Sequence, residues 1–155
     1  MKDTLLMLTG GARLFTGALA IVAVAQVSSS SAAAPSMVEV AQQLYENAKP
    51  NSFDAKCTGK GATLEVEGER HSCTRPDGAS IVRFAGDDAT QVTVYRKGLR
   101  KGELGKLKGK LGAPSSVKTL GAVKMHFWFT KEATVSLGFQ SSSQSQSTLV
   151  SYRAP

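Results

Sequence analysis

Short segments in which apolar and polar residues alternate dominate the chain from residue 63 onward. Residues 63–67 read TLEVE, and the same period of two returns in later segments. This alternation is typical of half-buried β-strands, because successive side chains of a strand point to opposite faces. Turn sequences rich in Gly, Asp and Pro separate the segments and favour antiparallel hairpins. We expect strands at 63–67, 70–74, 80–84, 91–95, 122–129, 133–139 and 148–152.

Two segments have helical periodicity instead. Residues 37–49 carry apolar side chains at intervals of three and four. Ser36 and Glu39 form the S-x-x-E pattern of a capping box at the start of this helix, and Pro50 ends it. A second helix is expected at 99–111, where one face carries the three leucines Leu104, Leu107 and Leu111.

The order helix, strands, helix, strands predicts an α+β fold. In this fold an antiparallel sheet has two helices packed on one of its faces. The two halves share an outline of one helix, a proline (Pro50 or Pro114) and three strands, which fits a tandem helix–three-strand repeat. Residues 37–155 are predicted to form a single domain, since a chain of this length can bury a substantial core.

The first 25 residues are predicted to be a signal peptide. Positive charge at Lys2 and Arg13 precedes the apolar run LFTGALAIVAVA, which ends in small residues of the kind that signal peptidase accepts. The run is shorter than the about 20 apolar residues of a membrane-spanning helix. Residues 26–36 are predicted to be a Ser/Ala-rich linker, within which cleavage near Ala33 is the alternative to cleavage after Ala25. The mature protein is therefore expected to be periplasmic or secreted, with an uncleaved amphipathic anchor as the alternative.

The chain has 2 cysteines, and both lie in the part expected to be exported. An even number of cysteines in an oxidising compartment favours a disulfide, here between Cys57 and Cys73. A disulfide closing a loop of this length stabilises a fold by about 3 kcal/mol in the chain-entropy description. A buried pair of free thiols is the alternative, and a redox pair is disfavoured because the spacing is not C-x-x-C.

Positive charge is concentrated in and just before the second predicted helix. The net charge is +7, and the only acid between residues 96 and 110 is Glu103. One interpretation is a surface that binds a polyanion such as lipopolysaccharide, a glycan or a nucleic acid, with steep salt dependence. The other is a solvated helix face whose long side chains shield the sheet. The candidate anion-binding residues are Arg100, Lys101, Lys106, Lys108 and Lys110.

A second candidate surface lies on the predicted strand 122–129. Alternation places the apolar residues 123, 125, 127 and 129 on one face and Lys124, His126 and Trp128 on the other. We expect the apolar set to face the core, which pairs Trp128 with Ser136 and His126 with Gly138 across a loop at 131–133. The outer face then carries an aromatic and polar patch typical of interfaces, unless Trp128 is covered by packing. The candidate partner-binding residues are Lys124, His126, Trp128 and Ser136.

The sequence contains no recognisable catalytic, cofactor-binding or metal-ligating set. No G-x-S-x-G or H-E-x-x-H motif occurs, and His71 and His126 have no ligand-like spacing to cysteines or carboxylates. A hydrophobic content of 41% excludes wholesale disorder, and 6% aromatic residues exclude a rich aromatic platform for nucleic acid. We therefore expect an exported, non-enzymatic binding protein without a cofactor, with a small hydrolase lacking a known motif as an alternative.

Residues 97–152 carry a recognisable order of features. The leucine-bearing helix is followed by the sequence LGAP at 111–114, a polar stretch to Gly121, and Trp128 in the next strand. This order resembles that of small bacterial envelope domains of the outer-membrane-assembly lipoprotein (SmpA/OmlA) type and of the β-lactamase-inhibitor-protein fold. The resemblance implies an α+β sandwich that binds another protein, in the envelope or outside the cell, through its sheet.

Overall fold

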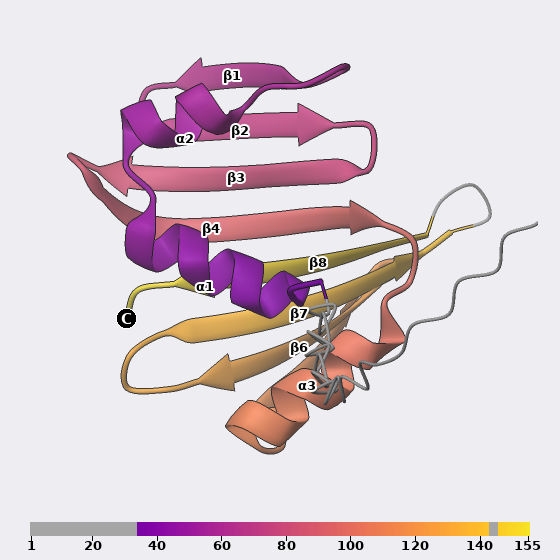
Figure 1. Cartoon of the computed structure of the whole chain (residues 1–155). Coiled ribbons are helices and arrows are strands. Elements are labelled where there is room, and N and C mark those ends of the chain that lie inside the picture. Colours follow the sequence, from indigo (N-terminus) through magenta and orange to yellow (C-terminus); the bar gives the residue numbers. More distant parts are fainter. Residues whose placement is uncertain (1–33, 143–145) are drawn as a thin grey trace, which may run out of the picture. The chain divides into compact units, whose positions relative to one another are not determined.

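The computed structural model describes residues 34–142 and 146–155. The predicted signal peptide (1–25) and most of the predicted linker (26–36) lie outside the described residues. The described part forms three helices and eight strands (Figure 1). None of these helices has the length and apolar character needed to cross a membrane. The helices are α1 (Met37–Asn47), α2 (Pro50–Lys56) and α3 (Lys101–Leu111). The strands are β1 (Thr63–Glu67), β2 (Arg70–Arg75), β3 (Gly78–Ala85), β4 (Asp88–Lys97), β5 (Ser116–Leu120), β6 (Val123–Phe129), β7 (Thr134–Ser141) and β8 (Gln146–Arg153).

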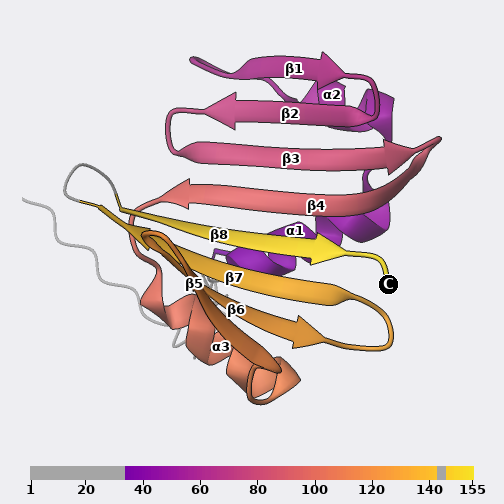
Figure 2. The same cartoon turned by 180° about the vertical axis from the view of Figure 1, so that it is seen from behind.

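All eight strands belong to one antiparallel sheet with the order β1-β2-β3-β4-β8-β7-β6-β5 (Figure 2). Each half of the chain contributes a four-stranded meander, and the last strands of the two meanders, β4 and β8, pair with each other. The prediction of two helices on a sheet of three-stranded halves is therefore wrong. It missed α2 and β5, and it therefore underestimated both the number of helices and the size of the sheet.

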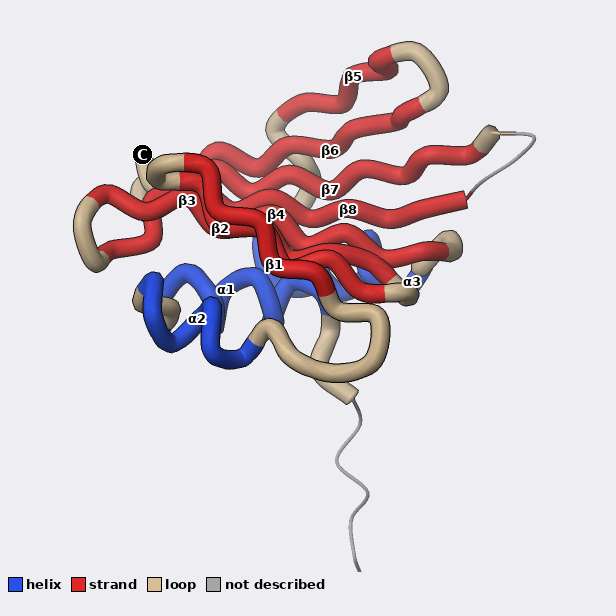
Figure 3. The backbone as a smooth tube through the Cα atoms, turned by 90° about the horizontal axis from the view of Figure 1, so that it is seen from above, coloured by secondary structure: helices blue, strands red, loops and turns tan. Residues whose placement is uncertain are grey.

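The three helices lie on the same side of the sheet (Figure 3). α1 packs on β4 and β8 at the centre, and α2 packs on β2. Pro50 was expected to end the first helix. It instead begins α2, because its fixed φ and missing N–H suit the first turn of a helix. The opposite face of the sheet has no helix on it within the described chain.

The start of α1 is held by two carboxylates. The predicted capping box is confirmed: Ser36 Oγ accepts a hydrogen bond from Glu39 N at 3.2 Å, and Glu39 Oε2 accepts one from Ser36 N at 2.7 Å. Glu103 of α3 adds a contact between helices, because its Oε2 accepts from Met37 N at 3.1 Å. Its carboxylate is buried and lies at the positive end of α1, where a negative charge is favourable. Glu103, the only acidic residue of α3, therefore has a structural role.

The predicted disulfide is confirmed. It joins Cys57, just after α2, to Cys73 on β2 with a Cα–Cα distance of 5.6 Å. A second contact between the same elements is the 2.8 Å pair of His71 Nδ1 and Asp54 Oδ1. Together they fix the short helix α2 against β2.

The pairing of β6 with β7 differs from the prediction by one residue. Trp128 pairs with Val135 and His126 with Leu137, so the predicted pairs Trp128–Ser136 and His126–Gly138 are wrong. The cause is the turn: Thr130 N donates to Ala133 O at 2.9 Å, and Ala133 N donates to Thr130 Oγ1 at 2.9 Å. These bonds close a two-residue turn where a three-residue loop was expected. A shift of one residue exchanges the faces of the facing side chains.

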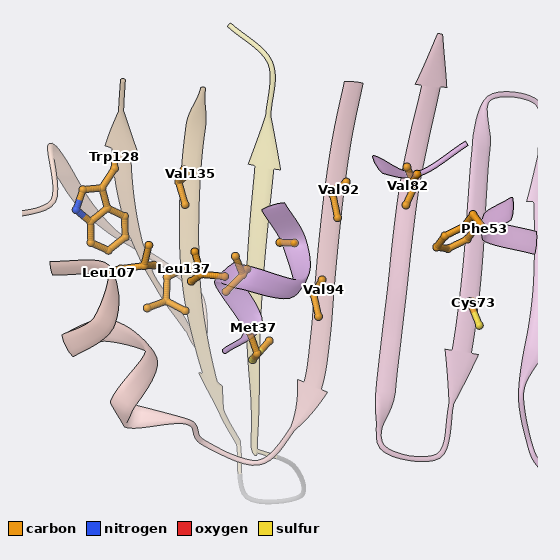
Figure 4. Packing of buried hydrophobic residues seen from close by; sticks show 14 of the residues in the cluster. Met37, Phe53, Cys73, Val82, Val92, Val94, Leu107, Trp128, Val135 and Leu137 are labelled. Atoms are coloured by element: carbon orange, nitrogen blue, oxygen red, sulfur yellow. The ribbon is translucent and has the colours of Figure 1, made fainter. Parts of the chain in front are cut away.

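The shifted register places Trp128 in the core. Its side chain is 2% exposed, whereas Phe129 is 60% exposed. Figure 4 shows Leu107 of α3 beside Trp128 and Leu137. The indole Nε1 donates to Gly112 O at 3.0 Å, which satisfies its one polar atom and ties β6 to the end of α3.

We predict that Trp128→Ala lowers the free energy of unfolding by about 3–5 kcal/mol, because it removes a large buried aromatic side chain. The matched control is Phe129→Ala, one position along the same strand, which should change it by no more than about 0.5 kcal/mol. Urea denaturation followed by far-UV circular dichroism measures both. Equal losses, or a larger loss for Phe129→Ala, would contradict the register.

We also predict that Glu103→Ala lowers the free energy of unfolding by about 1–3 kcal/mol, because the N–H of Met37 loses a buried charged acceptor. Glu132→Ala, at an exposed turn position, is the control and should be nearly neutral. The same denaturation experiment compares the two variants. A neutral Glu103→Ala would show that this contact does not hold α1 in place.

Candidate functional site

The four residues predicted to bind a partner do not form a surface patch. His126, Trp128 and Ser136 are buried, and Lys124 alone of the four is exposed. His126 stacks on Trp128 with ring centroids 6.3 Å apart and meets the edge of Phe139 at 6.2 Å. The predicted outward orientation of Trp128 and His126 is therefore wrong, for the reason of register given above. Of these four residues, only Lys124 is accessible to a partner unless the side chains of the sheet repack.

His126 is an unusual core residue. Its Nδ1 is buried without a hydrogen-bond partner among the described residues. Burial lowers the pKa of His126, and the positive charges of Lys124 and Lys108 lower the pKa further. Folding therefore favours the neutral form of the imidazole.

The five predicted anion-binding residues on and beside α3 are all exposed. They do not share one face, however. Lys110 Nζ donates to Gln42 Oε1 of α1 at 2.6 Å. The pKa of Glu39 is lowered mainly by its hydrogen bonds with Ser36, and further by the charges of Lys106 and Lys110. Part of α3 therefore faces α1. Binding of a polyanion by the cations of α3 stays a prediction.

Apolar side chains lie on the helix-free face of the sheet along β6 and nearby strands. We call this set the aromatic corner: Leu120, Met125, Phe127, Phe129 and Leu149. The rings of Phe127 and Phe129 stack at 6.2 Å on this face. Gly138 lies beneath, and a Cβ there would collide with the sulfur of Met125 and press on Leu149. The absence of a side chain at Gly138 thus allows Met125 and Leu149 to close over β7. Leu120 and Phe129 remain largely exposed, each at 60%.

An arginine row lies on the same face. Arg70 pairs in register with Arg83, Arg83 with Gln91, and Gln91 with Arg153. Arg70 donates to Glu67 Oε2 at 3.0 Å. Like charges directly opposite on neighbouring strands destabilise a sheet, so the facing pair Arg70 and Arg83 has a cost that a bound anion would reduce.

The arginine row borders a shallow hollow of about 180 Å³. Its lining combines the two facing arginines with an apolar side chain and neutral polar groups: Arg70, Ile81, Arg83, Gln91 and Thr93. Register places Arg153 beside Thr134, and Thr134 beside Phe129. The arginine row therefore leads across the sheet to the aromatic corner. The two features form one continuous surface, which we call the open-face surface.

The described residues bring together few side chains that could bind a metal ion or transfer a proton. No three His, Cys, Asp or Glu side chains lie close enough there to hold a metal ion. The His71–Asp54 pair was not anticipated, since the two residues are 17 positions apart and share no motif. His71 also packs edge-on against Phe84 at 5.0 Å, so the pair joins α2 to the sheet.

No protein-family description, curated protein or solved structure matches this chain. The structure itself defines a class: a disulfide-bonded, β-rich domain with one eight-stranded antiparallel sheet, helices on one face, and no described helix on the opposite face. The open-face surface was missed in the sequence because its residues come from six strands. That Arg83, Phe127 and Arg153 lie on one face of the sheet follows only from the order and register of the strands.

The pKa shift of His126 predicts how stability depends on pH. The unfolded chain takes up a proton below the ordinary pKa of 6.5, whereas the folded state takes it up only at lower pH. The free energy of unfolding should therefore be fully retained above about pH 6.5 and fall by up to about 1.4 kcal/mol per pH unit below it. Urea denaturation between about pH 8 and pH 5 tests this, with His126→Phe as the comparison. The variant should lose this part of the pH dependence, and an unchanged pH profile would contradict the assignment.

Proposed function

We propose that the protein is an exported, non-enzymatic binding protein whose open-face surface binds an acidic surface of another protein in the envelope or outside the cell. The main observation in support is that the described helices all lie on one side of the sheet (Figure 3). The other face carries the exposed Arg83 and Arg153 and the exposed ring of Phe129. Arginine and aromatic residues are the types that contribute most to protein interfaces.

The composition of the open-face surface supports a protein partner with negative charge. The aromatic corner supplies apolar area for desolvation, and the arginine row supplies planar donors that bind carboxylates with two hydrogen bonds at once. Arg83 and Arg153 are exposed, and no ion pair involves either in the described part of the chain. Acidic side chains of a partner would therefore meet free guanidinium groups.

The disulfide supports the exported location. Disulfides persist in oxidising compartments and are rare in reducing ones. The Cys57–Cys73 disulfide joins the end of α2 to β2. Together with the predicted signal peptide, this favours a partner in the periplasm or outside the cell. The resemblance of residues 97–152 to small envelope domains and the β-lactamase-inhibitor-protein fold fits binding through the sheet.

Site-specific photo-crosslinking in the producing cell tests the proposal. A benzoylphenylalanine at Phe129 or Ile81 probes the open-face surface, and one at Gly105 or Lys108 probes the exposed side of α3. We expect one protein adduct from both open-face positions and none from α3. Arg83→Glu with Arg153→Glu should abolish the Phe129 adduct, whereas Lys101→Glu with Lys108→Glu, an equal change of charge on the helix side, should leave it intact.

Two results would contradict the proposal. The first is the lack of any adduct at the open-face positions while α3 positions crosslink. The second is an adduct that survives the arginine reversal. If the lysine reversal instead removes salt-sensitive retention on a heparin column, polyanion binding through α3 becomes the better account.

A further inference from the structure

A cavity lies on the helix side of the sheet, between α1, α2 and strands β2 to β4. Its volume is about 500 Å³, within the about 300–1,000 Å³ of small-molecule pockets. The apolar part of its wall comes from both helices and from the disulfide: Val40, Leu44, Ala48, Phe53, Cys57 and Cys73. We call this cavity the interhelix pocket.

The charged side chains that line the interhelix pocket are all cations. They are Lys56, Arg75 and Arg96, and no Asp or Glu lies among the lining residues. Arg75 and Arg96 flank Gly78 on neighbouring strands, so their Cα atoms are two strand spacings apart, roughly 10 Å. Two guanidinium groups therefore approach one pocket with no carboxylate in its wall.

The existing contacts of the two arginines leave most of their donors available. Arg75 donates to Lys56 O at 2.8 Å, and Arg96 donates to Tyr95 O at 3.1 Å. Arg96 Nε also forms an ion pair of 3.8 Å with the largely exposed carboxylate of Asp77, a separation too long for a hydrogen bond. A guanidinium carries five N–H donors, so both arginines keep several for a ligand.

From these observations we infer that the interhelix pocket binds a small amphipathic carboxylate, such as a medium-chain fatty acid. The carboxylate lies between Arg75 and Arg96, where two planar donor groups match its geometry. The apolar tail lies against Leu44, Phe53 and the disulfide. This site is on the opposite side of the sheet from the open-face surface and does not depend on the proposed function.

Isothermal titration of the purified chain with sodium decanoate, below its micelle concentration, tests the inference. We expect saturable binding of one decanoate per chain. Arg75→Gln with Arg96→Gln should weaken it about tenfold for each arginine, because a hydrogen bond to a charged group is among the stronger ones. Lys118→Gln with Lys131→Gln removes equal charge at exposed positions outside the pocket and should leave the affinity unchanged.

Two further ligands separate the site from simpler explanations. Acetate has the charge without the tail, and decyltrimethylammonium has the tail without the negative charge; neither should bind measurably. Equal binding of decyltrimethylammonium would overturn the inference in favour of nonspecific adsorption to apolar surface. Equal binding of acetate would reduce the site to a simple anion site, and unchanged decanoate affinity in the arginine variant would exclude these arginines.

A second variant covers the case in which the arginine variant does not fold. Gln43→Glu with Asn47→Asp places two negative charges at exposed positions of α1 that line the pocket, without touching the core. Decanoate affinity should then fall about tenfold, because the two new carboxylates repel the carboxylate of the ligand. Full decanoate affinity in this variant would contradict binding in the interhelix pocket.

Discussion

The two-residue turn between β6 and β7 determines which side of the sheet the second half of the chain buries. Hydrogen bonds between Thr130 and Ala133 close this turn and set Trp128 opposite Val135. A strand has a side-chain period of two, so a shift of one residue would exchange its two faces. With the observed register, Trp128 packs toward α3 while Phe127 and Phe129 form the aromatic corner on the other face. The candidate binding surface therefore depends on a turn far from most of its residues.

The helix layer depends on contacts between the two halves of the chain. Pairing of β4 with β8 makes one sheet from two meanders, and α1 lies across that seam. Glu103 of α3 then accepts a hydrogen bond from the first turn of α1, so the second half caps a helix of the first. Because all three described helices lie on one side, no described helix covers the arginine row and the aromatic corner on the opposite face. The same arrangement forms the interhelix pocket between α1, α2 and the sheet.

Local features were predictable from the sequence, and features that depend on register were not. The capping box needs two residues three positions apart, and the disulfide follows from two cysteines in an exported chain. β5 was missed because Val117 and Leu120 are exposed and do not alternate, and α2 was missed because Phe53 is its single buried residue. The segment AVKMHFWF was read with the wrong face inward because both of its faces carry large apolar or aromatic side chains. The arginine row joins residues up to 83 positions apart, which no local pattern can reveal.

Trp128, rather than the aromatic corner, lies in the core. The chain contains 1 tryptophan, so quenching of its fluorescence by acrylamide reports on this side chain alone. We predict blue-shifted emission and a quenching constant several times smaller in the folded protein than in urea, because the indole is 2% exposed and bonded to Gly112. Quenching in the folded protein as efficient as in urea would place Trp128 on the surface and contradict the pairing of Trp128 with Val135.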